Sequence, residues 1–408
     1  MRTDVQVAVI GGGIVGVSVL YWLAKLGWTD TVLLERRELT SGSTWHAAGN
    51  TTYFGPYPKM TQLFAGSIRT YLQAQEESGQ SVGFHQTGSL RLAATQRELD
   101  LFHVFKPRFA QMGIPFHIRA PDEVGRLHPL IDAGDIFGAA HTPTDGHVDP
   151  TGATNAVAAA ARTMGAAVER HCPVESLRPE GGKWLLETPG GSVTAQQVVV
   201  ATSFWAREML AAIGLNLPLF ATQHHEIITE TVPEIAVLDS ELPAMRDSYV
   251  SCSVRQERDG LLIGIYENAP EFWALDGIPK DFKEELLPPN IDRLMPHLER
   301  LMERMPTFAQ AGIKVANNGP MCFTPDGLPI LGPIPEKAGL WLASGFNVGI
   351  GTGGGSGEFL AKWITSGHPP PGLEAVHADR FGNDMTAEAA LDAIRKVYAR
   401  GYHLPDSI

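Results

Sequence analysis

Three glycines near the N-terminus constrain the fold of this chain more than any other feature. Gly11, Gly13 and Gly16 have the spacing G-x-G-x-x-G, between a β-branched run over residues 5–10 and an apolar stretch over residues 14–26. We interpret this pattern as a strand, a tight turn and a helix. The first glycine permits the turn, the second lets the backbone approach a pyrophosphate, and the third lets the helix pack on the strand. The pattern therefore predicts a bound dinucleotide with its phosphates at the helix N-terminus.

A carboxylate at the expected place strengthens this interpretation. Residues 31–34 form a second short strand-like run that ends in Glu35, about twenty residues after the glycines, as the motif requires. An acid at this position accepts a hydrogen bond from a ribose 2′-OH and disfavours the 2′-phosphate of NADP. The motif alone does not distinguish FAD from NAD.

A second match to the glycine pattern, Gly349-x-Gly351-x-x-Gly354, follows a predicted strand late in the chain. No further βαβ unit with its own acid follows it. We therefore predict a glycine-rich loop and a helix N-terminus that approach the same cofactor, where the helix would stabilise negative charge on a flavin ring. A purely structural role for these glycines is the alternative.

The order of the predicted elements indicates an α/β fold with two domains. We predict a discontinuous Rossmann-like dinucleotide-binding domain formed by residues 1–85, 140–215 and 318–408. An inserted α+β substrate domain, with a mixed or antiparallel sheet, takes residues 86–139 and 216–317. The supporting elements are strands at 197–201 and 340–344, a hairpin over 183–194, helices over 152–164 and 358–364, alternating strands within 219–270, and a proline-interrupted helix over 281–305.

Composition excludes several classes of function. The net charge of −13 argues against binding nucleic acid or an anionic membrane, which requires clustered Lys and Arg. The three cysteines, Cys172, Cys252 and Cys322, are far apart, so we expect no disulfide framework and no metal site, and we predict a cytoplasmic location. Residues 5–24 are nearly all apolar, but their central glycines indicate the nucleotide-binding unit rather than a signal peptide or membrane span.

The stretch from Ser41 to Gly49, SGSTWHAAG, follows the first βαβ unit directly. Here the sequence resembles the dimethylglycine and sarcosine dehydrogenase group of the D-amino-acid-oxidase-like flavoenzymes. The resemblance continues through essentially the whole chain, in the stretches LPAMRD (242–247), RQERDGLL (255–262), NGP (318–320), TPD (324–326) and GFNVGI (345–350).

The resemblance implies that the cofactor is FAD and that the histidine of the first stretch, His46, carries it through the flavin 8α-methyl group. The alternative is a histidine that only hydrogen-bonds a non-covalent flavin. The resemblance also places Val174 near the adenine and Trp205 near the flavin. The other residues expected around the cofactor are Arg36, Gly42, Ser43, Thr44, Ala47, Ala48, Gly49, Gly345, Phe346, Asn347, Val348, Gly349 and Ile350.

Two departures from the family pattern matter. Larger members carry a C-terminal folate-binding domain, for which this sequence leaves no room after Tyr402. We therefore expect no folate dependence, and formaldehyde that is released or passed to a separate protein. Relatives also carry an active-site tyrosine just before the RQERDG-like stretch, where this chain reads SCSV (251–254). Tyr249 or Tyr266 could take its place in space.

Amine oxidation needs a neutral nitrogen, so a base should stand near the substrate. His224 matches the histidine of the family's H-Q-Y-like stretch, and His225 is the alternative; adjacent residues on a strand point to opposite faces, so we expect one of them to face the flavin. The carboxylate of an amino-acid substrate needs a cation, and Arg246 and Arg255 are both candidates.

The sequence therefore predicts an FAD-dependent enzyme that oxidises a small secondary or tertiary amine. N-demethylation of a dimethylglycine- or sarcosine-like amino acid, with release of formaldehyde, is the leading prediction. Oxidation of a cyclic imino acid or a primary amino acid is one alternative, and a flavoprotein subunit of an electron-transfer complex is another. A catalytically inert NAD-binding sensor is the least favoured. The electron acceptor, oxygen or an electron-transfer protein, stays open.

Overall fold

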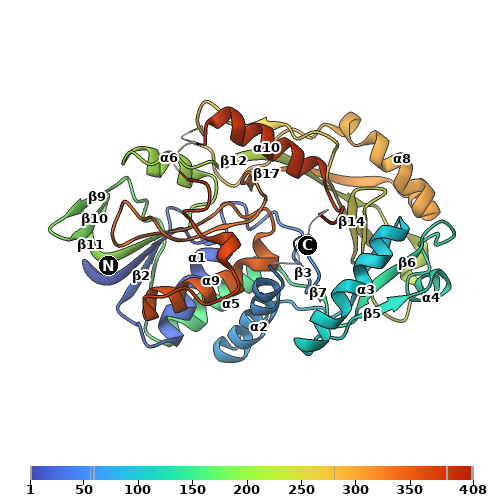
Figure 1. The fold of residues 1–408 in the computed structure, drawn as a ribbon, viewed down its shortest axis with the longest axis horizontal. Coiled ribbons are helices and arrows are strands. Elements are labelled where there is room, and N and C mark those ends of the chain that lie inside the picture. Colours follow the sequence, from blue (N-terminus) through green and yellow to red (C-terminus); the bar gives the residue numbers. More distant parts are fainter. Residues whose placement is uncertain (1, 56, 58–59, 280, 383–384, 406–408) are drawn as a thin grey trace.

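The structure is a computed structural model that describes residues 2–55, 57, 60–279, 281–382 and 385–405. Two large sheets lie side by side along an elongated molecule (Figure 1). The first sheet is centred on β1 (Asp4–Ile10), which pairs in parallel with its neighbours on both sides. The strand order is β18 (Ile330–Pro333), β19 (Leu340–Ser344), β11 (Gly191–Val200), β1, β2 (Thr31–Leu34) and β8 (Ala167–Glu169), and the antiparallel strands β10 (Lys183–Thr188) and β9 (Ser176–Glu180) extend from β11.

A layer of helices, which includes the helix of the first βαβ unit, covers one face of this sheet (Figure 1). α1 (Ile14–Lys25) packs against α5 (Pro150–Thr163) and α9 (Gly349–Ser366), and α9 packs in turn against α2 (Thr61–Ser78). Every residue of α1 from Ile14 to Ala24 is buried. This all-round burial explains the long apolar stretch at the N-terminus. Among the described residues, no helix is long and apolar enough to cross a membrane.

The glycine-rich segment after β19 was expected to be a loop with its helix starting near residue 358, and this prediction is wrong. The helix α9 already begins at Gly349. Its glycines let three helices approach closely: a Cβ at Gly355 would lie 2.2 Å from the Leu63 carbonyl oxygen in α2, and one at Gly357 would lie 2.4 Å from the Ser18 carbonyl carbon in α1. Tertiary packing here outweighs the low helix propensity of glycine.

The second sheet is antiparallel except for one parallel pair, β4 with β13. This mixed sheet agrees with the expected α+β substrate domain. Its order is β16 (Phe272–Trp273), β12 (Phe220–Thr229), β15 (Gly260–Ile265), β14 (Cys252–Glu257), β13 (Ala244–Asp247), β4 (Ser89–Ala93), β6 (Gly138–Thr142) and β5 (His117–Arg119), and β17 (Ile313–Phe323) also pairs with β12.

Smaller elements connect and cover the sheets. β3 and β7 form a two-stranded ribbon, and α10 lies over β12 and β17 (Figure 1). The remaining bounds are β3 (Asn50–Thr51), β7 (Gly146–His147), α3 (Gln96–Gln111), α4 (Pro121–Leu127), α6 (Trp205–Ala211), α7 (Pro233–Ala236), α8 (Met295–Arg304) and α10 (Ala387–Ala399), with 3₁₀ turns at Ile291–Arg293, Pro306–Gln310 and Glu374–Val376.

The helix expected over 281–305 is much shorter, because α8 starts only at Met295, beyond Pro288 and Pro289. The strands β6 and β17 cross the expected domain boundaries at residues 140 and 318, since both pair within the second sheet.

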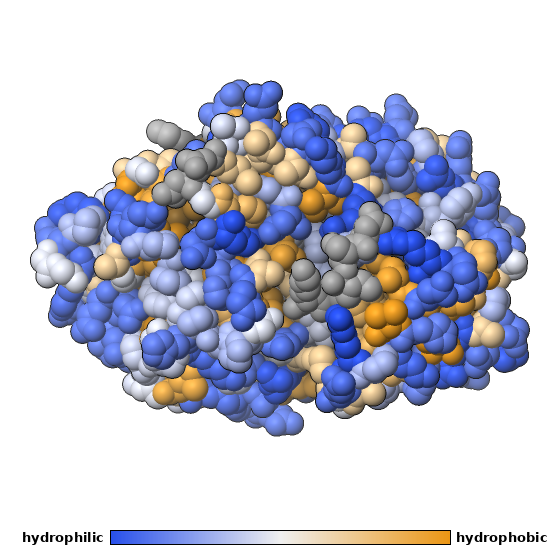
Figure 2. Space-filling view, viewed as in Figure 1, coloured by the Kyte–Doolittle hydropathy of each residue, from blue (hydrophilic) through white to orange (hydrophobic). Residues whose placement is uncertain are grey.

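The face of the molecule seen in Figure 1 is mostly polar, with apolar side chains gathered in separate patches (Figure 2).

Candidate active site

A cavity of about 650 Å³ is lined by residues from both sheets. It brings together most of the residues singled out from the sequence, although they come from segments hundreds of residues apart. Gly16, Gly345, His225, Arg255 and the tyrosine candidate Tyr249 are the sequence-predicted site residues that do not line it. Those that do are Gly11, Gly13, Glu35, Arg36, Gly42, Ser43, Thr44, His46, Ala47, Ala48, Gly49, Val174, Trp205, His224, Arg246, Tyr266, Phe346, Asn347, Val348, Gly349 and Ile350.

The glycine turn at the end of β1 has the geometry that a dinucleotide requires. Gly11 has a φ of +110°, and a Cβ there would lie 2.4 Å from the Ala201 carbonyl oxygen. A Cβ at Gly16 would lie 2.0 Å from the Gly11 carbonyl oxygen, so this third glycine serves helix–strand packing rather than direct cofactor contact. Gly13 precedes α1 and provides no side-chain cap, which leaves the helix N-terminus directed at the cavity.

Glu35 lines the cavity beside this turn. One carboxylate oxygen accepts a hydrogen bond from the Gly12 amide at 2.6 Å, and the other accepts one from the Arg37 amide at 2.8 Å. Each oxygen keeps a second lone pair, so the carboxylate can still accept a bond from a ribose hydroxyl. The Arg36 guanidinium stacks on the Trp205 ring at 4.1 Å, and Arg36, Trp205 and Val174 all line the cavity.

The segment from Ser41 to Gly49 crosses the cavity and is anchored at several points. The Ile14 amide donates a hydrogen bond to the Thr44 hydroxyl at 3.2 Å, which ties the segment to the start of α1. Arg255 donates to the Ala48 carbonyl oxygen at 2.9 Å. Gly49 has a φ of +78°, and a Cβ there would lie 2.2 Å from the Val148 carbonyl oxygen. These contacts hold the chain on both sides of His46.

His46 faces the cavity, and its ring lies against the backbone of Gly319. Its Nε2 is buried and has no hydrogen-bond partner among the described residues. Desolvation lowers the pKa of His46 to about 4, so the imidazole is neutral and nucleophilic at pH 7. A buried polar atom without a partner is costly unless something else satisfies it, and a bond to a cofactor would do so.

The N-terminus of α9 forms another part of the wall. Residues 346–351 line the cavity, and Val348 provides no side-chain cap. A Cβ at Gly349 would meet open space, whereas one at Gly351 would lie 2.9 Å from the Phe64 ring. The second glycine pattern therefore has a mixed role. Its first glycine opens onto the cavity, and the later ones serve helix packing.

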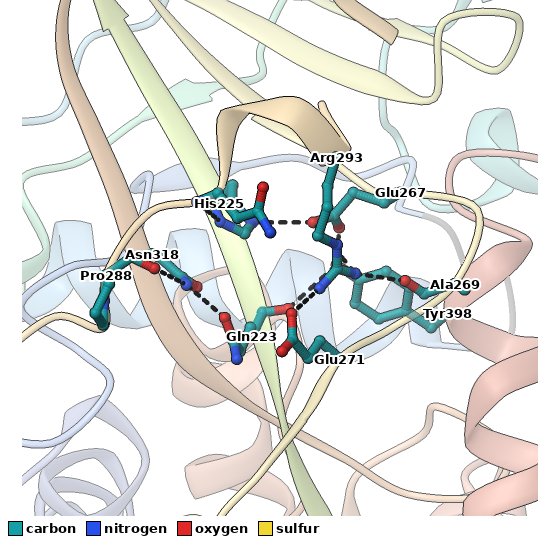
Figure 3. A network of polar contacts seen from close by, with 10 residues as sticks. Gln223, His225, Glu267, Ala269, Glu271, Pro288, Arg293, Asn318 and Tyr398 are labelled. Atoms are coloured by element: carbon teal, nitrogen blue, oxygen red, sulfur yellow. Dashed lines mark hydrogen bonds and ion pairs between the residues drawn. The ribbon is translucent and has the colours of Figure 1, made fainter. Parts of the chain in front are cut away.

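The two adjacent histidines on β12 point to opposite faces, as expected for a strand. His224 lines the cavity, and its Nδ1 is buried without a partner among the described residues. His225 turns away into a polar network in which its Nδ1 lies 2.9 Å from Glu267 and its Nε2 accepts from the Asn290 amide (Figure 3). His225 therefore supports the back of the strand and is not placed to act as the base.

Two titratable side chains of β12 share the cavity face and have pKa values shifted in opposite directions. Desolvation lowers the pKa of His224 to about 4. Desolvation raises the pKa of Glu226 to about 7, against the opposing influence of Arg255 and the Ala48 amide. Glu226 was missed in the sequence, although strand alternation places it on the same face as His224.

The structure separates the two candidate arginines. Arg246 is 5% exposed and lines the cavity, and no described residue forms a hydrogen bond or ion pair with its guanidinium. Arg255 instead bonds Ala48, the Gln256 carbonyl oxygen and, at 2.7 Å, Glu257. Arg246 is therefore the cation available to a substrate carboxylate, and Arg255 is a structural anchor.

Aromatic side chains close the same end of the cavity. The Tyr266 ring lies 4.7 Å from that of His224 and 5.3 Å from that of Tyr402, which comes from the segment after α10. Of the two tyrosines expected to replace the family's active-site tyrosine, Tyr266 is therefore in place. Tyr249 is 40% exposed, and its hydroxyl bonds Glu303 away from the cavity. Tyr402 had no local signal in the sequence.

One cluster outside the cavity has residue types typical of metal ligands. The ring nitrogens of His85 and His147 and a carboxylate oxygen of Glu241 lie within 4.8 Å of one another. The two rings are stacked with an interplanar angle of 19°, and the carboxylate oxygens of Glu241 accept one hydrogen bond from each ring. An ion lies in the plane of each imidazole that binds it, so stacked rings are poorly arranged for one. We interpret the cluster as a hydrogen-bonded clip that holds β7 to the loop before β13.

Comparisons with known proteins agree with this geometry. The chain is 43% identical to mouse dimethylglycine dehydrogenase over 96% of its length, 34% identical to human sarcosine dehydrogenase over 95%, and 32% identical to the formaldehyde-forming 4-methylaminobutanoate oxidase of Paenarthrobacter nicotinovorans over 97%. It covers 46%, 42% and 48% of these proteins, so it spans about half the length of the relatives it matches.

A solved structure and a family model support the same placement. The L-proline dehydrogenase from P. horikoshii superposes with a TM-score of 0.79 and 26% identity, over 93% of this chain and 98% of that one. The model of the FAD-dependent oxidoreductase family matches residues 6–363. The expected fold class and the resemblance to the dimethylglycine and sarcosine dehydrogenase group are thus confirmed, and this chain belongs to the FAD-dependent oxidoreductase family.

Proposed function

We propose that the chain binds FAD covalently through His46 and oxidises a small N-methyl amino acid at the carbon next to nitrogen, with loss of the methyl group as formaldehyde. The observation that carries the substrate class is Arg246, a buried guanidinium without a described partner that faces the cavity. A buried cation of this kind is stabilised by a ligand carboxylate. The relatives named for N-methylated amino acids support the amine half of the proposal.

The residues around the cavity fit FAD. The glycine turn, the N-terminus of α1 and Glu35 suit an adenine dinucleotide, and the N-terminus of α9 lines the same cavity, where it would stabilise negative charge on a flavin ring bound beside it. The unpartnered Nε2 of His46 is the atom free to bond the flavin. When bound, FAD supplies the hydride acceptor that amine oxidation requires.

The protein's own contribution is binding and proton control. Arg246 would orient the substrate by its carboxylate, and Tyr266 and Tyr402 exclude water from the same end of the cavity. Neutral imidazole and a carboxylate that titrates near neutrality stand on one face of β12, so a proton can leave the substrate nitrogen there. Oxygen and an electron-transfer protein stay alternative electron acceptors, and a cytoplasmic location stays a prediction.

Oxidation of a cyclic imino acid is the second candidate, favoured by the fold match to an L-proline dehydrogenase. Formaldehyde separates the two. Purified protein should be supplied with sarcosine, dimethylglycine, 4-methylaminobutanoate and L-proline while flavin bleaching and formaldehyde are recorded. Bleaching with formaldehyde supports N-demethylation. Bleaching by L-proline alone would replace it with ring oxidation, and no bleaching by any of the four would contradict both.

Covalency is tested on the same preparation. Denatured protein should retain the flavin absorbance and show an intact mass increased by one FAD, and His46→Ala should lose both. Flavin that separates from denatured wild-type protein would contradict the covalent bond while leaving the amine oxidase proposal in place.

A further inference from the structure

The floor of the substrate end of the cavity is a single row of residues that runs across four strands of the second sheet. Arg246 of β13 is paired with Ser253 of β14, Ser253 with Gly264 of β15, and Gly264 with Glu226 of β12. All four residues line the cavity. Because directly paired residues in a sheet project from the same face, the row forms one continuous strip of the cavity wall.

The row carries opposite charges at its two ends and small residues between them. Three strand spacings of about 4.8 Å put the Arg246 and Glu226 backbones on the order of 14 Å apart. Between the two charged side chains lie Gly264 and Ser253, and the Ser253 side chain forms a hydrogen bond with Tyr402. No ion pair joins Arg246 to Glu226 within the described residues, so each charged group is available to a ligand. The strip therefore has a positive charge at one end, which could bind the carboxylate of a zwitterion, and a negative charge at the other, which could bind its ammonium group.

The surroundings of Glu226 favour a carboxylate that receives a proton. Arg255 is the cation near it, but that guanidinium is already bonded to Glu257, Ala48 and Gln256. The Ala48 amide also acts on the Glu226 carboxylate. The other titratable groups near it are His224 on its own strand, Tyr266 directly after β15, and Tyr402 shortly after α10.

We propose that Glu226 is the second substrate anchor: it binds the ammonium group of a zwitterionic amine whose carboxylate lies on Arg246, and it accepts the N–H proton before oxidation. This inference rests on the proposed function and names the charge pattern of its substrate. In the step, the N–H bond breaks, its electron pair stays on nitrogen, and an O–H bond forms on Glu226. The neutral amine then holds the lone pair that drives oxidation.

The relative basicity of the two β12 side chains agrees with this assignment. The pKa of His224, lowered to about 4, makes its imidazole a weak base, whereas Glu226, with a pKa raised to about 7, is ionised above neutrality and holds a proton well below it. The rate at low substrate concentration should therefore increase as the pH rises through about 7, because only ionised Glu226 can bind the cation and take its proton.

Two probes that cannot be oxidised and have nearly equal shapes separate the effect of the substrate's positive charge from the effect of its shape. Glycine betaine carries a quaternary nitrogen without a lone pair, and 3,3-dimethylbutanoate is its neutral-tailed counterpart with the same carboxylate. Their affinities for the holoenzyme should be measured by calorimetry between pH 6 and 8.5, for wild type and Glu226→Gln. At pH 8 the variant should bind betaine roughly tenfold more weakly, while the neutral counterpart changes less than about twofold.

The pH dependence provides the second readout. Betaine binding to wild type, and kcat/KM for sarcosine, should both rise through about pH 7, and both inflections should be absent in Glu226→Gln. Glu230→Gln, an exposed carboxylate just beyond the end of the same strand, is the matched control and should behave as wild type. Unchanged melting temperatures would exclude misfolding as the cause.

The outcomes separate this inference from the proposed function. An active enzyme whose Glu226→Gln variant binds betaine as tightly as wild type and keeps its pH inflection would overturn the role of Glu226 alone. A wild-type protein that binds neither probe and oxidises no N-methyl amine would overturn the proposed function itself.

Discussion

The imidazole of His46 lies against Gly319, where a Cβ would come within 2.5 Å of two ring atoms. Gly319 and His46 come from opposite parts of the sequence, one from β17 and the other from the segment after β2. The absence of a side chain at residue 319 is thus part of what sets the orientation of the histidine ring.

Gly319→Ala should displace the His46 ring and reduce covalent attachment of FAD. The reason is steric, because the histidine has to move by an ångström or more to clear the new methyl group. The fraction of protein whose intact mass includes FAD measures the effect. Gly312→Ala is the control, since its Cβ would meet only the flexible Glu230 side chain at 3.2 Å. Full flavinylation of Gly319→Ala would show that the ring position tolerates the contact.

Arg246→Met should increase KM for carboxylate-bearing amines by roughly a hundredfold, because a buried charge-assisted pair is lost. An amine that lacks a carboxylate, such as N-methylbenzylamine, should be affected little. Arg255→Met is the contrasting variant: it frees the Ala48 carbonyl oxygen and should alter flavin attachment rather than carboxylate preference. An equal loss for amines with and without a carboxylate in Arg246→Met would contradict the anchoring role.

His128 should contribute to acid sensitivity independently of the cofactor. It is 1% exposed, its Nδ1 has no partner among the described residues, and desolvation lowers its pKa to about 4. The unfolded chain, with an ordinary histidine pKa near 6.5, binds the proton first, so stability present above about pH 6.5 is lost as the pH falls toward 4.

The linkage predicts a loss of about 2 kcal/mol between pH 7 and pH 5 from this one residue. His128→Leu should remove that part of the pH dependence, as measured by urea unfolding midpoints at the two pH values. Replacing the exposed His368 with leucine should leave the change in unfolding midpoint between the two pH values as it is in wild type. The same change in unfolding midpoint between the two pH values for wild type and His128→Leu would refute a lowered pKa of His128.

Gly355→Ala should destabilise the fold by about 3 kcal/mol or more, since its Cβ would lie 2.2 Å from the Leu63 carbonyl oxygen and both helices would have to separate. Flavin content should fall together with the melting temperature. Gly125→Ala, in α4, is a helical control whose Cβ meets open space, and it should be neutral or slightly stabilising. A normal melting temperature for Gly355→Ala would show that α9 can shift freely.

Short sequence motifs predicted those parts of the site whose residues lie close together in the sequence. β2 and β19 have the expected bounds, and the glycine turn, Glu35 and the His46 segment all follow one another within the first 49 residues. The spacing of such motifs depends on the backbone of one continuous unit, so sequence alone is informative there.

The parts that could not be predicted depend on pairing between distant segments. Arg246 pairs with Ser253, which lies two residues before Arg255 on β14, so both arginines project from the same face of the sheet. What separates them is that Arg255 is bonded to Ala48, Gln256 and Glu257, and the Ala48 contact joins segments that are distant in the sequence. Tyr402 reaches Tyr266 only because α10 folds back over β12. Glu226 was predictable in principle, since period-two alternation follows directly from the choice of His224.

The glycines of α9 also have a consequence for how the protein handles its cofactor. Their direct contacts join α1, α9 and α2 without intervening side chains that could change rotamer. Gly353, in the second turn of α9, packs against Ile14 at the start of α1. The two helix N-termini that line the cavity are therefore fixed relative to each other by the protein itself, so the site for the charged parts of the cofactor is preorganised before binding.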